Sequence, residues 1–236
     1  LQMNARAIST RNWRPLILVF VKDVDERMEL VKLAASFGQN RGVLSIAKLI
    51  STSDTEARAH RPEIKQQMLS DLKEHGLEAF CEVDVVNSVH TGIRNISKGH
   101  GIAGLKTNTV MFGWSGNAES NANQLRIIRD LAIAGKNIIL ARFNDHEAWK
   151  EPHHRIIDIW WSGHENNGDL MLILAFMLRL NRDWEHARIR VQAVVETEAG
   201  RRSWTRSIER SLARSRIPAS VSLHMKQEES FREILA

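Results

Sequence analysis

The residues whose type and spacing could bind a phosphate are those of Gly113 to Asn117 (GWSGN), which follow a predicted strand and precede a predicted helix. Free backbone N–H groups and the helix dipole favour an anion at a helix N-terminus. Gly113, Ser115, Gly116 and Asn117 are therefore a candidate nucleotide or phosphate loop.

This loop resembles that of nucleotide-binding universal stress proteins only in part. Those proteins place a glycine loop at this position and a second Gly-Ser/Thr pair further along, where this chain has Leu125 to Ile127 (LRI). A structural turn is therefore the favoured interpretation, and a functional or vestigial nucleotide site that takes ATP is the alternative. The glycines of Gly99 to Gly104 (GHGIAG) precede their strand instead of following it, so they predict a flexible turn and not a dinucleotide site.

Neither metal-dependent nor nucleophilic catalysis has a motif in this sequence. The densest group of potential metal ligands is a run of histidines and glutamates: His146, Glu147, Glu151, His153 and His154. No HExxH or Cys/His spacing accompanies them, so a solvated loop is favoured. No GxSxG nucleophile elbow occurs. We therefore predict no catalytic residue, no metal site and no enzymatic activity.

The composition indicates a globular protein. The chain has 236 residues, of which 43% are hydrophobic and 26% charged. Its single cysteine, Cys81, excludes an intramolecular disulfide and lies in a predicted strand, which favours a buried structural thiol. The net charge of +5 is spread along the chain without a zinc-finger or RNA-recognition motif, so nucleic acid is not a predicted partner.

Strands and helices alternate along the whole chain. The predicted strands are residues 15–21, 43–50, 77–85, 108–112 and 138–141, and then 156–161, 187–195 and 219–223. Helical patterns between them predict an α/β fold with doubly wound, mostly parallel sheets. A seam at Pro152 divides it into two subdomains, residues 12–147 and 153–236. The chain starts at Leu1 and stops inside an apparent helix, so we expect it to be part of a longer polypeptide.

The most unusual helix contains nine consecutive apolar residues, Leu170 to Leu178. It is too short for a bilayer, because the run covers about 14 Å and a membrane core needs about 30 Å. It is apolar all round, which favours a place in a core or against a partner subunit. The candidate residues for dimer or inter-subdomain packing are Trp160, Trp161, Leu170, Leu174 and Met177. One of the two tryptophans should face the core and the other the opposite side of the strand.

A second helix, Arg201 to Arg216, is basic and amphipathic. Its apolar side has Trp204, Ile208 and Leu212, and arginines separate them. An ordinary packed helix with a solvated charged face is favoured. The alternative is a membrane-side face that docks on anionic lipid headgroups or a membrane-embedded partner, with Arg206, Arg210 and Arg214 as the candidate residues.

Three motifs together resemble one family. Asn12 to Val19 (NWRPLILV) resembles the start of the cytoplasmic C-terminal domain of cation-chloride cotransporters. Gly101 to Trp114 (GIAGLKTNTVMFGW) is similar to that family's GLGGLKPNTVxxGW segment, with Thr107 in place of the proline. Asp158 to Trp161 (DIWW), the apolar helix, Trp184 and Arg188 to Val191 (RIRV) follow in family order.

The resemblance implies a universal-stress-protein-like fold and a homodimer. It also implies a role on the cytoplasmic side of the cell membrane, beneath the transmembrane transport domain of the same polypeptide. That transporter would move chloride with K⁺ and/or Na⁺. The domain itself would carry no transport site and would support assembly, trafficking and regulation. The compact tail suggests a prokaryotic or minimal member.

Overall fold

The computed structural model describes residues 14–38, 43–102, 105–114, 117–143, 156–163 and 165–226. They fall into two compact units, a first unit Arg14–Ala148 and a second unit that contains Trp149–Ala236. The predicted subdomain boundaries at residues 12, 147 and 153 lie outside the described residues.

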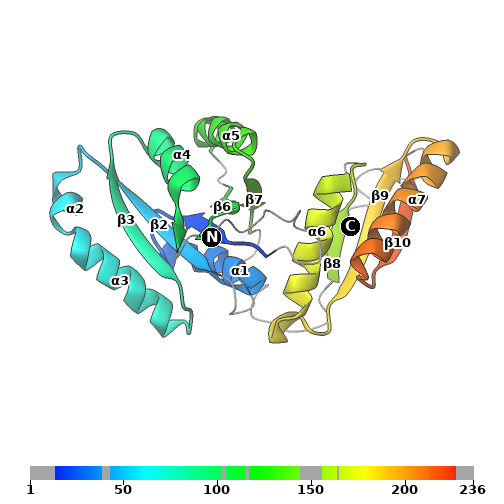
Figure 1. The fold of residues 1–236 in the computed structure, drawn as a ribbon, viewed down its shortest axis with the longest axis horizontal. Helices are drawn as coiled ribbons and strands as arrows, with labels where there is room; N and C mark the ends of the chain where they lie inside the picture. The colour runs from blue at the N-terminus through cyan, green and yellow to red at the C-terminus, as the bar shows by residue number, and fades with distance from the viewer. Residues whose placement is uncertain are drawn as a thin grey trace, which may run out of the picture. The chain divides into compact units, whose positions relative to one another are not determined.

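The first unit is built on a five-stranded parallel sheet with the order β3-β2-β1-β6-β7 (Figure 1). Its strands are β1 (Ile17–Phe20), β2 (Leu44–Ser51), β3 (Phe80–Val86), β6 (Thr109–Gly113) and β7 (Asn137–Ala141). In the central strand, Ile17 pairs with Leu44 on one side and with Thr109 on the other. Leu18 and Val19 are completely buried. A strand with helices on both faces requires such a continuous apolar run.

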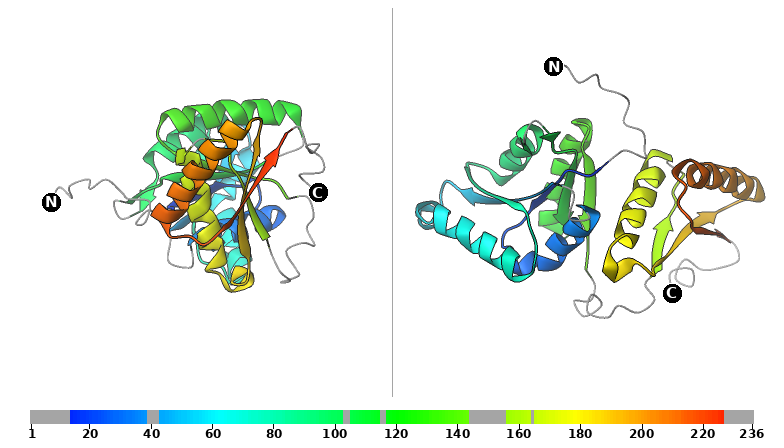
Figure 2. Two further views of the ribbon diagram at one scale, coloured as in Figure 1. Left: turned by 90° about the vertical axis from the view of Figure 1, so that its right-hand side faces the viewer. Right: turned by 60° about the horizontal axis from the view of Figure 1, so that its bottom comes forward.

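Helices cover both faces of this sheet. α1 (Met28–Gly38), preceded by the 3-10 turn η1 (Asp25–Arg27), and α3 (Arg61–Glu74) lie on one face; α4 (Val89–Gly99) and α5 (Ala118–Ile133) lie on the other (Figures 1 and 2). Right-handed crossovers explain this division, because the chain moves from β1 towards β3 and then returns past β1 to β6. Under α4 and α5 the core consists of Ile93, Val110, Phe112, Ile127 and Leu131.

Two local elements differ from the sequence prediction. The short helix α2 (Thr55–Ala59) lies in a polar segment for which no element is predicted. It forms because the Asp54 carboxylate accepts a hydrogen bond from the Ala57 N–H at 2.9 Å, which is an N-cap. In the segment predicted to be a flexible turn, β4 (Gly101–Ile102) forms an antiparallel pair with β5 (Leu105–Lys106), and residues 103 and 104 lie outside the described residues.

The second unit has a three-stranded parallel sheet with the order β10-β9-β8. Its elements are β8 (Ile156–Trp160), α6 (Glu165–Arg179), η2 (Arg182–Trp184), β9 (Arg188–Val195), α7 (Glu198–Ser215) and β10 (Ser220–Met225). Helices α6 and α7 pack against the same face, over a core that includes Ile159, Trp161, Leu172, Val191 and Ile208. The predicted α/β class with mostly parallel sheets is confirmed in both units.

Candidate functional sites

A large hollow of the first unit lies at the carboxyl end of its sheet, where β1 and β6 are neighbours. The connection that leaves β1 runs towards β2, and the connection that leaves β6 runs the opposite way, towards β7. Ligands of open α/β sheets bind at such a point. Its volume of about 820 Å³ is that of a small-molecule site. The lining comes from the ends of β1, β2 and β6 and from the first turns of α4 and α5. It includes Phe20, Lys22, Arg27, Ser51, Ser88, His90, Phe112, Gly113, Asn123 and Gln124.

This pocket combines an aromatic wall with cationic groups. Phe20 and Phe112 stack with ring centroids 5.8 Å apart and planes inclined by 12°. Arg27 lies beside the glycine that ends β6, because a Cβ built on Gly113 would be 3.8 Å from the Arg27 guanidinium. Gln124 donates a hydrogen bond from Nε2 to the Gly113 carbonyl at 3.0 Å. An apolar wall for a ring and a guanidinium for an anion match the chemistry of a nucleotide.

The predicted phosphate loop contributes to this pocket only in part. Gly113 lines it, whereas Ser115 and Gly116 lie outside the described residues. Asn117 caps α5, because its Oδ1 accepts a hydrogen bond from the Ser120 N–H at 3.0 Å. This N–H of the first helical turn therefore already has an acceptor within the chain. The sequence did not predict that the start of α4 lines this pocket. Ser88 stands at the N-cap of α4 without a capping hydrogen bond from its side chain, and only the tertiary fold brings it beside Gly113.

Two of the sequence motifs meet at Asn108. Its Oδ1 accepts from the Leu16 N–H at 2.9 Å, and its Nδ2 donates to the Arg14 carbonyl at 2.8 Å. The Thr109 hydroxyl also donates to the same Oδ1 at 2.8 Å. The asparagine of the KTNTV segment therefore fixes the chain segment that leads into β1, at the amino end of the sheet.

Thr107, which replaces the proline of the resembled motif, has a structural role of its own. Its N–H donates to the His100 carbonyl at 3.1 Å, a bond that proline cannot make. Its carbonyl accepts from the Lys136 ammonium. The substitution thus adds one backbone hydrogen bond between the end of α4 and the strand that follows.

Asp158 and Arg190 join the remaining motifs on the face of the second sheet that is opposite α6 and α7. The Arg190 Nε and NH2 donate to the two carboxylate oxygens at 2.7 and 2.6 Å, a bidentate pair. Gln192 donates to the same carboxylate at 3.2 Å, and its Oε1 lies 2.9 Å from the His224 Nε2. The hydrogen bond from Arg190 lowers the pKa of Asp158 below its ordinary value, against the opposing effect of burial.

The predicted packing residues divide between three surfaces. Trp161 is 3% exposed and lies in the core of the second unit, so one tryptophan faces the core as predicted. Trp160 lies on the other face, with its ring centroid 6.3 Å from that of His224. In α6, Leu172 and Ala175 face the sheet, and the helical period places Leu170 and Leu174, both half-buried, on the opposite side. Met177 is already buried within the chain, at 2% exposure. Whether these five residues form a dimer or inter-subdomain surface stays a prediction.

The predicted membrane-side arginines are all exposed on α7, but they have different partners. Arg214 forms an ion pair with Asp169 of α6. Arg206 donates from Nε to the Arg202 carbonyl at 3.3 Å, and Arg210 donates to the Arg206 carbonyl at 3.2 Å. Arg214 therefore holds α7 to α6, and the outward cationic surface is centred on Arg202, Arg206 and Arg210.

The remaining candidates from the sequence are the cysteine and the histidine and glutamate group. Cys81 is a buried free thiol whose pKa is raised by burial, as expected for a structural cysteine. The residues 146–154 of the predicted histidine and glutamate group lie outside the described residues. In the described ranges, no three His, Cys, Asp or Glu side chains are grouped to hold a metal ion, and no helix has the length and apolarity to cross a bilayer.

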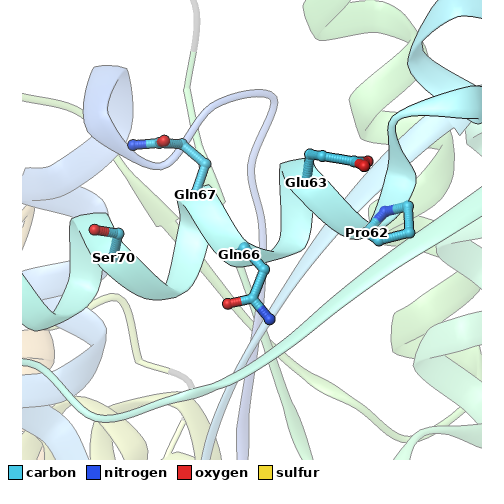
Figure 3. A pocket seen from close by; sticks show the side chains of 5 residues that line it. All are labelled: Pro62, Glu63, Gln66, Gln67 and Ser70. Atoms are coloured by element: carbon cyan, nitrogen blue, oxygen red, sulfur yellow. The ribbon is translucent and has the colours of Figure 1, made fainter.

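A shallow open hollow on α3 is lined by five residues of that single helix: Pro62, Glu63, Gln66, Gln67 and Ser70 (Figure 3). In Figure 3 these side chains spread to different sides of the helix instead of converging. Because convergent polar groups define a ligand site, this hollow is a surface feature and not a candidate site.

Two comparisons relate the chain to known proteins. The family model described as "Solute carrier family 12" matches residues 27–126, which run from η1 into α5 of the first unit. A crystal structure of the cytoplasmic domain of a prokaryotic cation chloride cotransporter has a similar fold. The TM-score is 0.66 at 15% sequence identity, and the match covers 90% of this chain and 79% of that one.

Proposed function

We propose that this chain is a non-catalytic assembly and regulatory domain of a cation-chloride cotransporter, on the basis of the family-model match and the similar fold described above. It would lie on the cytoplasmic side of the cell membrane, attached to the transmembrane transport domain of the same polypeptide. That domain would move chloride with K⁺ and/or Na⁺. The family model and the structural match support the family, and the geometry of the second unit supports the assembly role.

The second apolar side of α6 is the observation that carries the assembly role. Leu172 and Ala175 already fill the core of the unit, so Leu170 and Leu174 are not needed to cover the sheet. A helix that packs against one sheet requires one apolar stripe, and a second stripe serves another packing partner. Leu170 and Leu174 are half-buried, and an obligate homodimer interface is apolar in this way.

Light scattering after size exclusion tests this assembly. A homodimer has twice the chain mass of 26.9 kDa. The double variant Leu170→Gln, Leu174→Gln should shift the mass towards that of the monomer with unchanged helix content. The matched control Leu69→Gln changes an exposed leucine of α3 and should remain dimeric. A wild-type chain that is monomeric at all concentrations contradicts the proposal, and a dimeric double variant places the dimer surface elsewhere.

A nucleotide sensor is the second candidate function, and the pocket between β1 and β6 is the observation that favours it. The stacked Phe20 and Phe112 would contact a base, and Arg27 and Lys22 would bind phosphates. Isothermal titration of ATP tests this function. Because a hydrogen bond to a charged group contributes about 1.5–3 kcal/mol, Arg27→Gln should weaken ATP binding by about tenfold or more. Lys32→Gln on exposed α1 surface is the control, and no binding by the wild type excludes the sensor.

A further inference from the structure

The outward side of α7 is a continuous cationic row. Arg202, Arg206 and Arg210 follow one another at four-residue spacing and are exposed. The helical period of 3.6 residues places them opposite Ile208, which is completely buried in the core. The neighbouring positions on this side of the helix have small residues: Ala199, Ser203 and Ala213. The two acidic residues of the helix, Glu198 and Glu209, lie together towards one flank.

The row is held in place by the helix itself. The two bonds from Arg206 and Arg210 to the carbonyls four residues earlier keep both guanidinium groups along the helix surface. Like charges at four-residue spacing destabilise a helix, so this arrangement does not serve the stability of α7. Two neighbouring arginines of the helix form ion pairs, Arg214 with Asp169 and Arg201 with Glu198.

We propose that the row of Arg202, Arg206 and Arg210 docks on the anionic headgroups of a lipid surface. This inference rests on the proposed function, which places the domain beside the cytoplasmic leaflet. Positive side chains near such a leaflet are attracted by its negative surface potential. The row is about 12 Å long, and its three positions lie within about 80° of one another around the helix axis, so the long side chains can reach a planar array of headgroups together.

The character of the same surface distinguishes lipid from other anionic partners. Single-stranded nucleic acids stack their bases on aromatic side chains, and the one aromatic residue of α7, Trp204, is half-buried on the inner side near Gly163. The outward side has no large apolar residue to insert between acyl chains. The contact is therefore electrostatic, reversible and confined to the headgroups.

Flotation with vesicles tests the proposal on the purified full chain. The vesicles contain phosphatidylcholine alone or an equal mixture with phosphatidylglycerol. The row variant carries Arg202→Gln, Arg206→Gln and Arg210→Gln. The control variant carries Lys65→Gln, Lys73→Gln and Arg126→Gln, three exposed positions of the first unit. Both triple variants lower the net charge from +5 to +2, so they differ only in where the charge is removed.

We expect the wild type and the control to bind the mixed vesicles and not pure phosphatidylcholine. Each basic residue near an anionic surface contributes about a fivefold effect, so the row variant should partition about 100-fold more weakly. An unchanged row variant, an equal loss in the control, or a wild type that ignores the mixed vesicles overturns the proposal. Retardation of duplex DNA through the same arginines, without vesicle binding, would assign the row to nucleic acid instead. The mass of each variant, measured in parallel, separates this outcome from failure of the proposed dimer.

Discussion

Gly168 is the position where a single methyl group should disturb the second unit most. It lies in α6 directly over the indole of Trp161. A Cβ built on Gly168 would be 2.1 Å from Cζ3 and 2.2 Å from Cη2 of that ring. Trp161 is 3% exposed and packed in the core, so its ring has no free space to move into. We therefore predict that Gly168→Ala destabilises the unit, although alanine is the better helix former.

The magnitude follows from two opposing effects. In an unobstructed helix, glycine to alanine stabilises by about 1 kcal/mol. Carbon atoms in contact are separated by about 3.5 Å, so the ring and the helix must move apart by about 1.5 Å. Overpacking of this kind costs about 1–3 kcal/mol, and the burial of Trp161 puts the cost near the upper end. The expected net loss is about 2 kcal/mol in the free energy of unfolding.

Urea unfolding followed by tryptophan fluorescence measures this loss, since Trp160, Trp161, Trp184 and Trp204 all belong to the second unit. The control Gly99→Ala adds a methyl at the end of α4, where nothing lies within 4 Å, and should be neutral or stabilising. In a Trp161→Phe background, Gly168→Ala should cost little, because the outer ring atoms are gone. A stable Gly168→Ala variant, or an equal loss in the Phe background, would refute the reasoning.

Three further changes probe the motif contacts and one helix end. Asn108→Leu removes three hydrogen bonds and leaves the Leu16 N–H without its acceptor. The free energy of unfolding in urea should therefore fall by about 2–3 kcal/mol. An unchanged midpoint would contradict the role of Asn108. The pKa of Asp158 is lowered in the folded chain by the hydrogen bond from Arg190. This pair therefore stabilises at pH above the unfolded value of about 3.9 and is lost as pH falls through the lower folded value. Asp158→Asn should accordingly be less stable than the wild type at pH 7, with a difference in thermal midpoint that closes below about pH 4. Arg216 ends α7 with a φ of 56°, in the left-handed region that glycine adopts without strain. Arg216→Gly should therefore raise the thermal midpoint by an amount equivalent to about 0.5–1 kcal/mol. The control Arg214→Gly, inside the helix, should lower it.

The strands and long helices could be predicted because their apolar periods are local properties. Ile17 to Phe20 and Thr109 to Gly113 are apolar runs in the sequence and buried parallel strands in the structure. Helix α2 is short and polar, and it depends on the Asp54 cap, so no hydrophobic period marks it. The β4–β5 pair has two residues in each strand, too few for an alternating pattern.

The pocket could be predicted only at Gly113, and the physical reason is its construction from distant segments. Ser88 and His90 reach it from α4, and Lys22 and Arg27 from the β1–α1 connection. None of these residues has a distinctive spacing to the others. The parallel topology brings them together, and that topology depends on long-range strand pairing and not on local pattern.

Asn108, Asp158 and Arg190 of the sequence motifs lie where they hold strands in position, outside the lining of the pocket. Asn108 lies before the amino end of β6, and the pocket lies at the carboxyl end of the same strand. Asp158 and Arg190 pair across β8 and β9 in direct register. Parallel strands are not joined by a tight hairpin that fixes their alignment. Side-chain contacts set the alignment instead, either between neighbouring strands or with the segment that leads into a strand. Residues that served catalysis would converge on a cavity. These motif residues instead fix the positions of strands.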